Sequence, residues 1–406
     1  MGSINHRKAK VKVTLKKKDG QPLSNKKVDY KQINHEFLFG CNVFDALPFV
    51  DKATDPKRKE ILDERMKMWL DLFNFGTLPF YWGRYEEKEG VTIKDTMMEA
   101  AKFLKSKNIT LKGHPLCWHT VCADWLLQYD NETILKKQVE RIHREVTDFK
   151  GLIDMWDAIN EVVIMPIFDK YDNAVTRLCN EHGRVGLVKK VFEEAKIANP
   201  NASFLINDFN TTANYEHLIE DLLEAEVPLT HIGIQSHQHQ GYWGIDKIQD
   251  VLERFSRFHL PIHFTENTII SGKLMPKEIE DLNDYVVSDW PTTPEGEDRQ
   301  AKEVIEMYET LFAHPSVEAI TTWDFDDDNK WLGAPCGLIR KDNSPKPVYG
   351  ELMKKIHGEW ESKGLVHTDD KGSLELEVFK GDYELEIDGK IYSINTKQEV
   401  YELTVD

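Results

Sequence analysis

Short apolar segments alternate with amphipathic segments through most of this chain, and no other feature of the sequence restricts the fold as strongly. The apolar runs are FLFGCN (37–42), NFGTLPFY (74–81), ITLKGH (109–114), IDMWDAIN (153–160), SFLIND (203–208), HIGIQS (231–236), PIHFTE (261–266) and EAITTW (318–323). Between them, apolar residues recur at three- and four-residue steps, which predicts helices at 58–73, 97–107, 132–149, 185–198, 216–226, 246–258 and 298–313.

Strands that alternate with helices in this way predict an α/β fold, a (β/α)₈ TIM barrel whose strands are buried on both faces. An open, doubly wound sheet is the alternative for the same alternation. That alternative is less well supported, because no glycine-rich phosphate loop follows the first apolar run.

The two ends of the chain have a different pattern. Residues 11–33 and 373–406 alternate apolar and polar side chains around DG and GD turns, which is typical of short antiparallel strands with one solvated face. Neither segment has enough apolar residues for a core of its own. We therefore expect a small accessory β-sandwich built from both ends, with N-terminal strands in 1–35, C-terminal strands in 363–406, and the barrel in 36–362.

The charge of the chain excludes some classes of partner. Its 406 residues include 52 Lys and Arg against 70 Asp and Glu, a net charge of −18, whereas nucleic acids and anionic membranes bind basic surfaces. No apolar run is long enough for a transmembrane helix. The five cysteines lack the paired spacing of a zinc site or a disulfide scaffold. We expect a monomer without a nucleic-acid or membrane partner.

Polar or aromatic side chains stand at the end of nearly every predicted strand. They are His114, Asn160, Glu161, Asn207, Asp208, Gln235, His237, Glu266 and Trp323. A single polar residue at a strand end is usually a satisfied hydrogen-bond partner. In a (β/α)₈ barrel, however, the carboxyl ends of all strands meet at one mouth, where active sites are built. We therefore expect these side chains to form one site.

Two of these residues, Glu161 and Glu266, suit the cleavage of a glycosidic bond. A lone glutamate at a strand end would be interpreted as an ion-pair or capping partner. Across one pocket, a protonated carboxyl group can release the leaving oxygen while an ionised one attacks the anomeric carbon. Retaining enzymes hold the two groups about 5–5.5 Å apart, a separation that a barrel mouth can supply.

Tryptophans in the strand-end loops support a sugar site. Trp82, Trp118, Trp323 and Trp331 all lie in such loops. Core packing is the alternative for each of them. Aromatic faces stack on the C–H faces of sugar rings while Asn, Gln and His bind hydroxyl groups, so the combination favours a carbohydrate ligand.

Six motifs resemble the successive blocks of glycoside hydrolase family 10, the endo-β-1,4-xylanase family. They are GHPLCWH (113–119), WDAINE (156–161), NDFN (207–210), GIQSHQH (233–239), HFTEN (263–267) and TTWDFDDDNKW (321–331). Order, spacing and strand placement agree from near residue 37 to KPVYGEL (346–352), about three-quarters of the chain.

This resemblance implies a retaining, double-displacement hydrolysis of xylan or a related plant β-glycan, without a cofactor or metal. Glu161 would be the acid/base, Glu266 the nucleophile, and Asn160 would contact the 2-hydroxyl group of the sugar. The other residues that would line the cleavage subsite are His114, Trp118, Gln235, His237, Trp323 and Trp331, with His237 hydrogen-bonded to the nucleophile.

The sequence also departs from the family pattern. On the glycone side, where the family has Glu, Asn and Lys, it has Thr77, Leu78 and Tyr81. The usual Tyr of the third motif is Phe209, and Asn267-Thr268 replace a Leu-Asp pair. Cleavage of a β-glycoside is therefore predicted more securely than xylan as the substrate, and a non-xylan β-glycosidase of the same family is the alternative.

Two other classes of protein remain as alternatives. A metal-dependent barrel hydrolase could use the HxH pair His237 and His239 with His114, His119 and Asp208, although such hydrolases usually carry HxH on the first strand. A catalytically silent carbohydrate-binding barrel is the other, although such proteins typically lose one of the two glutamates. For an enzyme of plant polysaccharides we expect a secreted or cell-surface location, with an export signal outside this sequence; the alternative is a cytoplasmic enzyme of imported oligosaccharides.

Overall fold

The structure, a computed structural model, describes residues 2–328 and 330–405. Contacts divide the chain into two compact units. One contains the residues up to Leu38, Phe312–Pro315 and the residues from Gly350 onward, and the other contains Phe39–Leu311 and Ser316–Tyr349. The sequence pattern assigns 312–315 and 350–362 to the barrel, whereas the contacts group them with the chain ends.

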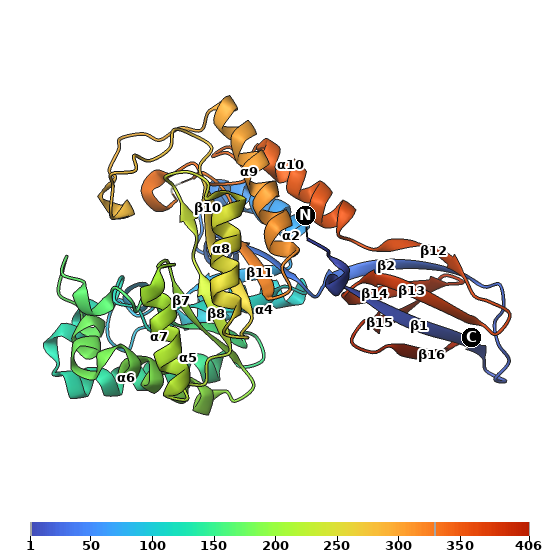
Figure 1. The fold of residues 1–406 in the computed structure, drawn as a ribbon, viewed down its shortest axis with the longest axis horizontal. Coiled ribbons are helices and arrows are strands. Elements are labelled where there is room, and N and C mark those ends of the chain that lie inside the picture. The colour runs from blue at the N-terminus through green and yellow to red at the C-terminus, as the bar shows by residue number, and fades with distance from the viewer. Residues whose placement is uncertain (1, 329, 406) are drawn as a thin grey trace. The chain divides into compact units, whose positions relative to one another are not determined.

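The larger unit is a closed barrel of parallel strands (Figure 1). Around the barrel the strands are β3 (Leu38–Asn42), β4 (Phe75–Pro79), β5 (Thr110–His114), β6 (Met155–Asn160), β7 (Ser203–Asp208), β8 (His231–Ile234), β10 (Ile262–Ile269) and β11 (Val317–Thr322). Strand β11 pairs with both β3 and β10, which closes the sheet. The (β/α)₈ barrel predicted from the alternation is confirmed.

Helices connect consecutive strands, as the periodicity predicts. The main ones are α2 (Pro56–Leu72), α4 (Lys94–Ser106), α5 (Asn131–Asp148), α6 (Ala174–Ala198), α7 (Ala213–Glu224), α8 (Gly244–Ser256), α9 (Pro294–Phe312) and α10 (Pro347–Lys354). Shorter elements in the strand-end loops are α1 (Ala46–Val50), α3 (Trp82–Tyr85), η2 (Asp124–Gln128), η3 (Met165–Ile167), β9 (His237–Gln238), η4 (Leu282–Asp284) and η5 (Trp331–Gly333). The π-helical turn η6 (Lys355–Glu359) follows α10.

Helix α6 begins well before the predicted segment 185–198. The side chain of Asn173 accepts a hydrogen bond of 2.8 Å from the backbone N–H of Thr176 and caps the helix at its start. Gly183 then interrupts the helical backbone with φ of 70° and ψ of 165°. Because this break restarts the hydrophobic periodicity, the sequence pattern reveals only the second half of the helix.

The loop after β11 is held in place by buried ion pairs. The fully buried guanidinium of Arg65 lies 2.9 Å from both Asp45 and Asp326. The buried ammonium group of Lys346 lies 2.7 Å from Asp327. Paired, buried charges are costly to separate, so they hold this loop, which carries Trp331, in one arrangement.

The smaller unit consists of two sheets that share one apolar core. Their strands are β1 (Lys8–Lys17), β2 (Lys27–His35), β12 (Lys363–His367), β13 (Ser373–Phe379), β14 (Gly381–Ile387), β15 (Lys390–Asn395) and β16 (Val400–Val405). Sheet β13-β1-β16 and sheet β12-β2-β14-β15 bury their alternate apolar residues, such as Val13 of β1 and Leu385 of β14, in the same cluster. The accessory β unit built from both chain ends is confirmed.

One pairing in this unit differs from the predicted antiparallel arrangement. Strand β1 runs antiparallel to β13 but parallel to β16, with Leu15 opposite Leu403. Parallel partners need a long connection between them. The barrel segment supplies that connection here, which local turn signals could not indicate.

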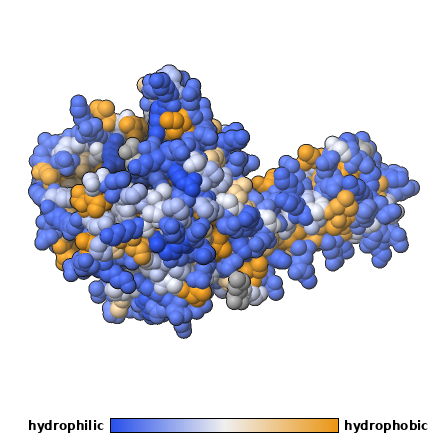
Figure 2. All heavy atoms as spheres, turned by 90° about the horizontal axis from the view of Figure 1, so that it is seen from above, coloured by the Kyte–Doolittle hydropathy of each residue, from blue (hydrophilic) through white to orange (hydrophobic). Residues whose placement is uncertain are grey.

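The surface of each unit is mainly polar. On the face drawn in Figure 2, hydrophilic side chains predominate and the apolar ones are scattered. Within the described residues, no helix has both the length and the apolar composition needed to cross a bilayer.

Candidate active site

Most of the side chains predicted at strand ends meet at the carboxyl-terminal mouth of the barrel. Asn160 closes β6 and is followed by Glu161, Asn207 lies near the end of β7, Gln235 directly follows β8, and Glu266 lies within β10. Parallel strands that start at one end of a closed barrel all finish at the other, so these residues converge from four neighbouring strands.

A chain of side-chain amides joins the two glutamates. Asn160 Oδ1 accepts hydrogen bonds from Asn207 Nδ2 at 2.9 Å and from Gln235 Nε2 at 3.1 Å. The Gln235 amide also donates to Glu161 Oε1 at 3.0 Å, and the Asn207 amide also donates to Glu266 Oε1 at 2.8 Å. Buried networks in which each amide has partners hold their members rigidly, so both carboxyl groups are fixed relative to one another.

Glu161 is arranged to carry a proton. Burial, with smaller contributions from the negative charges of Glu266 and Asp208, raises its pKa to about 8. Hydrogen bonds from Gln235 and from the indole N–H of Trp118, at 2.9 Å, oppose this shift without cancelling it. Glu161 also has a left-handed backbone with φ of 58°, a costly conformation for a non-glycine residue and one that clusters at functional sites.

Glu266 is arranged to stay ionised. Burial raises its pKa, but the charges of His114 and His237 and the hydrogen bond with His237 outweigh burial and hold the pKa below its usual value. His237 Nε2 lies 3.2 Å from Glu266 Oε2, and His114 Nε2 lies 3.9 Å from Oε1. One mouth therefore presents a protonated carboxyl group and an ionised one.

Asp157, which was not predicted as a site residue, positions the His114 imidazole beside Glu266. Its Oδ2 lies 2.7 Å from His114 Nδ1 and 2.8 Å from Lys112 Nζ, and all three side chains are buried. Burial raises the pKa of Asp157, but Lys112 and His114 keep it below the usual value. The ionised Asp157 thus orients His114 toward Glu266. A carboxylate in the middle of the mainly apolar strand β6 was the available signal.

Aromatic rings surround the carboxyl groups. The Trp118 indole contacts Glu161, and the ring of Trp331 lies 4.7 Å from that of His237. The ring of Trp323 lies 5.4 Å from that of His114. The mouth therefore combines aromatic faces with amide, imidazole and carboxyl groups, which is the composition expected of a sugar site.

Trp82 is not one of the aromatic rings at the barrel mouth, which corrects its interpretation as a sugar-stacking residue. The residue is buried, its indole N–H donates to Glu86 at 3.1 Å, and the guanidinium of Arg141 lies 5.0 Å from its ring centre. Its neighbour in the sequence, Tyr81, takes the place at the site, with ring centres 5.5 Å from Trp118 and 5.6 Å from His114.

The three atypical residues of the second strand have different positions. Thr77 and Leu78 are completely buried in β4, and the Thr77 hydroxyl group has no hydrogen-bond partner among the described residues. Only Tyr81 lies near the two glutamates: burial is the main cause that raises the pKa of its phenol, and the charges of Glu266 and Glu161 contribute to the shift. Of the three atypical residues in this segment, Tyr81 is therefore the one whose side chain can contact a bound sugar.

The two other departures also differ in position. Phe209 is 42% exposed on the surface beyond β7. Thr268 is buried, and its hydroxyl group lies 3.4 Å from His237 Nδ1. A neutral hydroxyl group instead of a carboxylate thus orients the imidazole beside Glu266.

The residues of the metal-hydrolase alternative are occupied by other contacts. His239 Nδ1 lies 3.3 Å from the Thr268 hydroxyl group, and the ring of His119 packs on Phe168 with centres 4.5 Å apart. Asp208 accepts from the backbone N–H of Val163 at 3.1 Å. Among the residues that the structure describes, none of these candidates falls in a cluster with metal-ligand spacing.

Comparison with known proteins agrees with this geometry. The family model for Glycosyl hydrolase family 10 matches residues 80–355, more than half of the chain. The chain belongs to this family of glycoside hydrolases.

Among named relatives, the Endo-1,4-beta-xylanase/feruloyl esterase of Xylanibacter ruminicola is 26% identical over 293 residues, covering 64% of this chain and 39% of that protein. Endo-1,4-beta-xylanase A of Caldicellulosiruptor is 27% identical over 277 residues, with coverage of 63% and 38%. Anti-sigma-I factor RsgI6 of Acetivibrio thermocellus is 23% identical over 394 residues, with coverage of 94% and 45%. The chain thus spans less than half the length of each of these relatives.

Solved structures share the fold. The family 10 enzyme of Paenibacillus barcinonensis superposes with a TM-score of 0.64 at 21% identity, covering 80% of this chain and 96% of that one. A thermostable mutant of the xylanase Xyn10A of Cellvibrio japonicus gives the same TM-score and identity, with coverage of 80% and 98%.

Proposed function

We propose that the protein is a retaining glycoside hydrolase, of the endo-1,4-β-xylanase type, that cleaves xylan or a related plant β-glycan by double displacement. The observation that carries the proposal is the opposite protonation of two linked carboxyl groups. At neutral pH, Glu161 with its pKa raised to about 8 holds a proton, while the pKa of Glu266 is lowered and the group is ionised.

The first step uses both groups at once. Glu266 attacks the anomeric carbon while Glu161 gives its proton to the glycosidic oxygen. The bond between the anomeric carbon and the leaving oxygen breaks, and the glycone becomes an ester of Glu266. His114 and His237, which favour the ionised form of Glu266, keep the attacking carboxylate available for this step.

The second step reverses these roles. Glu161, now ionised, removes a proton from a water molecule, and the resulting hydroxide attacks the anomeric carbon. The ester bond to Glu266 breaks, and the product keeps the starting configuration after two inversions. Asn160, fixed by Asn207 and Gln235, would contact the 2-hydroxyl group during both steps.

The choice of xylan rests on the names of relatives, of which several are endo-1,4-beta-xylanases. The aromatic rings of Trp118, Trp323 and Trp331 would stack on the sugar units. Tyr81 in place of a charged glycone-binding residue favours decorated xylans or other β-linked glycans over plain linear xylo-oligosaccharides.

The test combines a product profile with the stereochemistry of hydrolysis. Products would be measured on a panel of plant polysaccharides and aryl β-glycosides, and the anomer formed first would be identified by proton NMR. We expect the β-anomer to accumulate before mutarotation. A first product of inverted configuration would disprove double displacement.

A carbohydrate-binding barrel without turnover is the second candidate. The observation that favours it is the relative aligned over 94% of this chain, which is named as an anti-sigma factor and not as a hydrolase. Release of reducing sugar from xylan by the wild-type protein, lost in Glu266→Ala, would exclude this candidate. Binding of xylo-oligosaccharides without any release of sugar would establish it.

A further inference from the structure

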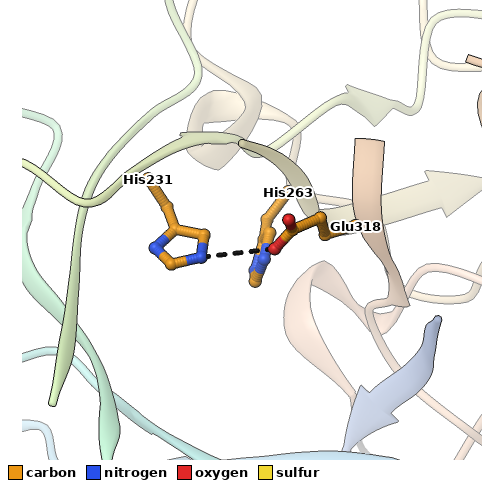
Figure 3. A group of neighbouring side chains, drawn as sticks. All are labelled: His231, His263 and Glu318. Atoms are coloured by element: carbon orange, nitrogen blue, oxygen red, sulfur yellow. Dashed lines mark ion pairs between the residues drawn. The ribbon is translucent and has the colours of Figure 1, made fainter. Parts of the chain in front are cut away.

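Two histidines and a glutamate meet at the end of the barrel opposite the two catalytic-site glutamates. His231 is the first residue of β8, while His263 and Glu318 are the second residues of β10 and β11. In Figure 3 the three side chains face one another from these neighbouring strands. Within β10, His263 precedes Glu266 by three residues, which corresponds to about 10 Å along a strand.

We propose that His231, His263 and Glu318 bind a divalent transition-metal ion, with Zn²⁺ as the best-matched ion, that ties β8, β10 and β11 together. Within the described part of the chain, these residues alone form a group of three or more candidate metal ligands whose donor atoms all lie within 4.8 Å of one another. Two imidazoles and one carboxylate, with the fourth position left to water, are a donor set that zinc accepts. Nitrogen donors disfavour Ca²⁺ and Mg²⁺.

His231 directs one ring nitrogen at a hydroxyl group and the other at Glu318. Its Nδ1 lies 2.8 Å from the hydroxyl group of Thr230, and that hydroxyl group donates to the carbonyl of Phe204 at 2.8 Å. A proton on Nδ1, donated to Thr230, is the tautomer that leaves Nε2 available to a metal ion. Nε2 lies 3.5 Å from Glu318 Oε2, so a cation between the two atoms could bind both.

His263 supplies the independent observation that a ligand is missing from this group. The side chain is completely buried, and neither ring nitrogen has a hydrogen-bond partner among the described residues. Buried polar atoms without partners are rare and costly. A neutral imidazole that is buried without a partner can offer a ring nitrogen to a metal ion.

The distances need only a small adjustment. Zinc–nitrogen and zinc–oxygen bonds of about 2.0–2.1 Å place tetrahedral donors about 3.3 Å apart. The His231–Glu318 separation of 3.5 Å already matches this value. Because all donor atoms lie within 4.8 Å, no pair has to close by more than about 1.5 Å. The side chain of Glu318 is 52% exposed and can turn to make this adjustment.

The position indicates a stabilising role. Residues at the amino-terminal end of barrel strands contribute to stability and not to catalysis. Register pairs Ile262 of β10 with Ile232 of β8 on one side and with Val317 of β11 on the other, so a bound ion would bridge three adjacent strands of the closed sheet. An ion that binds only the folded chain raises its melting temperature by mass action.

The test measures zinc binding by the full chain after removal of metals with a chelator. We expect reloading with micromolar zinc chloride to give one bound ion per chain at this site, and a hundredfold excess over Kd to raise Tm by roughly 3–4 °C. Replacement of zinc by Co²⁺ should give the visible absorption of a low-coordinate Co²⁺ ion.

Two variants assign the ion to this cluster. Glu318→Gln and His263→Phe should each weaken zinc binding by at least about 100-fold and abolish the Tm shift. His263→Phe removes two unpartnered nitrogens but places a larger ring at a completely buried position, so the exposed Glu318 is the more informative of the two positions. Hydrolytic activity without zinc should be unchanged in Glu318→Gln, which is remote from the barrel mouth.

Glu194→Gln is the matched control. Its carboxylate also pairs with a histidine, His143, at 2.6 Å, but among the described residues this pair belongs to no group of three candidate ligands, so this variant should bind zinc as the wild type does. The proposal is wrong if the wild type takes up no zinc under these conditions, or if Glu318→Gln binds zinc with unchanged stoichiometry and affinity. Because Glu318 is exposed, this second result is decisive even if His263→Phe does not fold.

Discussion

The imidazole of His237 lies between Glu266 and Thr268, with Nε2 3.2 Å from the carboxylate and Nδ1 3.4 Å from the hydroxyl group. Together with His114, this histidine lowers the pKa of Glu266. Removal of His237 should therefore change the pH dependence of hydrolysis.

His237→Gln should move the acid limb of the kcat/KM profile to higher pH. As the proposed nucleophile, Glu266 must be ionised to attack, so activity should be lost as the pH falls through its pKa. His237 lowers that pKa, and its removal allows the pKa to rise. The control is His143→Gln, whose partner is Glu194 and whose profile should be unchanged. An acid limb that stays in place in His237→Gln would contradict the role assigned to this residue.

Trp118→Phe should move the alkaline limb to higher pH. Glu161, the proposed acid, can give up a proton only while protonated, so kcat/KM should fall above about pH 8 in the wild type. The indole N–H of Trp118 stabilises the ionised form, and without it the pKa of Glu161 rises further. Trp125→Phe, which removes a donor to the Glu86 carbonyl, should leave this limb where it is.

Replacement of each of the two glutamates should affect hydrolysis in a different way. Glu266→Ala should lower kcat on every substrate by about 10⁴-fold or more, because no covalent intermediate forms. Glu161→Ala should lower turnover of xylan by about 10²- to 10⁴-fold. On aryl glycosides with an acidic phenol it should still release one equivalent rapidly, since that leaving group needs little protonation. Rapid-quench measurements of phenol release distinguish the two. Equal losses on both substrate classes in both variants would argue against the assignment.

Tyr81→Ala should weaken binding of short xylo-oligosaccharides. If the ring stacks on a glycone sugar, its loss removes roughly 0.5–1.5 kcal/mol, or about a 2- to 10-fold increase in KM for xylotriose. Tyr81→Phe keeps the ring and should stay close to the wild type. A lower KM in Tyr81→Ala would mean that the ring obstructs the glycone side. Leu78 is not a useful target for this question, because it is buried in β4.

Arg65→Met should destabilise the barrel by about 1.5–3 kcal/mol, since it removes the buried guanidinium that Asp45 and Asp326 share and leaves Lys330 as the remaining cation beside both carboxylates. Arg58→Ala is the matched control. Arg58 also pairs with an aspartate of the same loop, Asp328, but its side chain is 36% exposed, so its loss should cost about 0–1 kcal/mol. Urea unfolding followed by tryptophan fluorescence measures both. Equal costs in the two variants would contradict the view that burial makes the difference.

The strands and the convergence of the strand-end residues could be predicted because hydrophobic periodicity and parallel connectivity are local properties of the sequence. The orientation of individual side chains could not. The β6–β7 register shifts between Asp157 and Ile159, and Glu161 has a left-handed backbone. The regular alternation of inward- and outward-facing side chains therefore breaks down at the end of β6 that contributes to the site. For this reason the contact between Asp157 and His114 could not be predicted from the sequence.

Neighbouring residues in the strand-end loops show the same limit. Tyr81 and Trp82 are adjacent in the sequence, yet Tyr81 is the N-cap of the short helix α3 and Trp82 is its first residue. Tyr81 lies beside His114, whereas Trp82 packs on Arg141. Composition predicts that aromatic rings line the mouth, but tertiary packing decides which ring does so. The monomeric state and the secreted or cell-surface location stay predictions.

The parallel pairing of β1 with β16 has a consequence for how the chain is made. Lys16 of β1 and its partner Glu402 of β16 are separated by 386 residues. At about 5–20 residues per second, a ribosome needs roughly 20–80 s to synthesise that interval. Throughout this time β1 lacks β16, and it also lacks β13 on its other edge until Ser373–Phe379 has been synthesised, whereas the barrel strands can pair as they emerge. The first strand to be synthesised is therefore among the last to be completed, and it is the segment for which a nascent-chain chaperone would have the longest opportunity to bind.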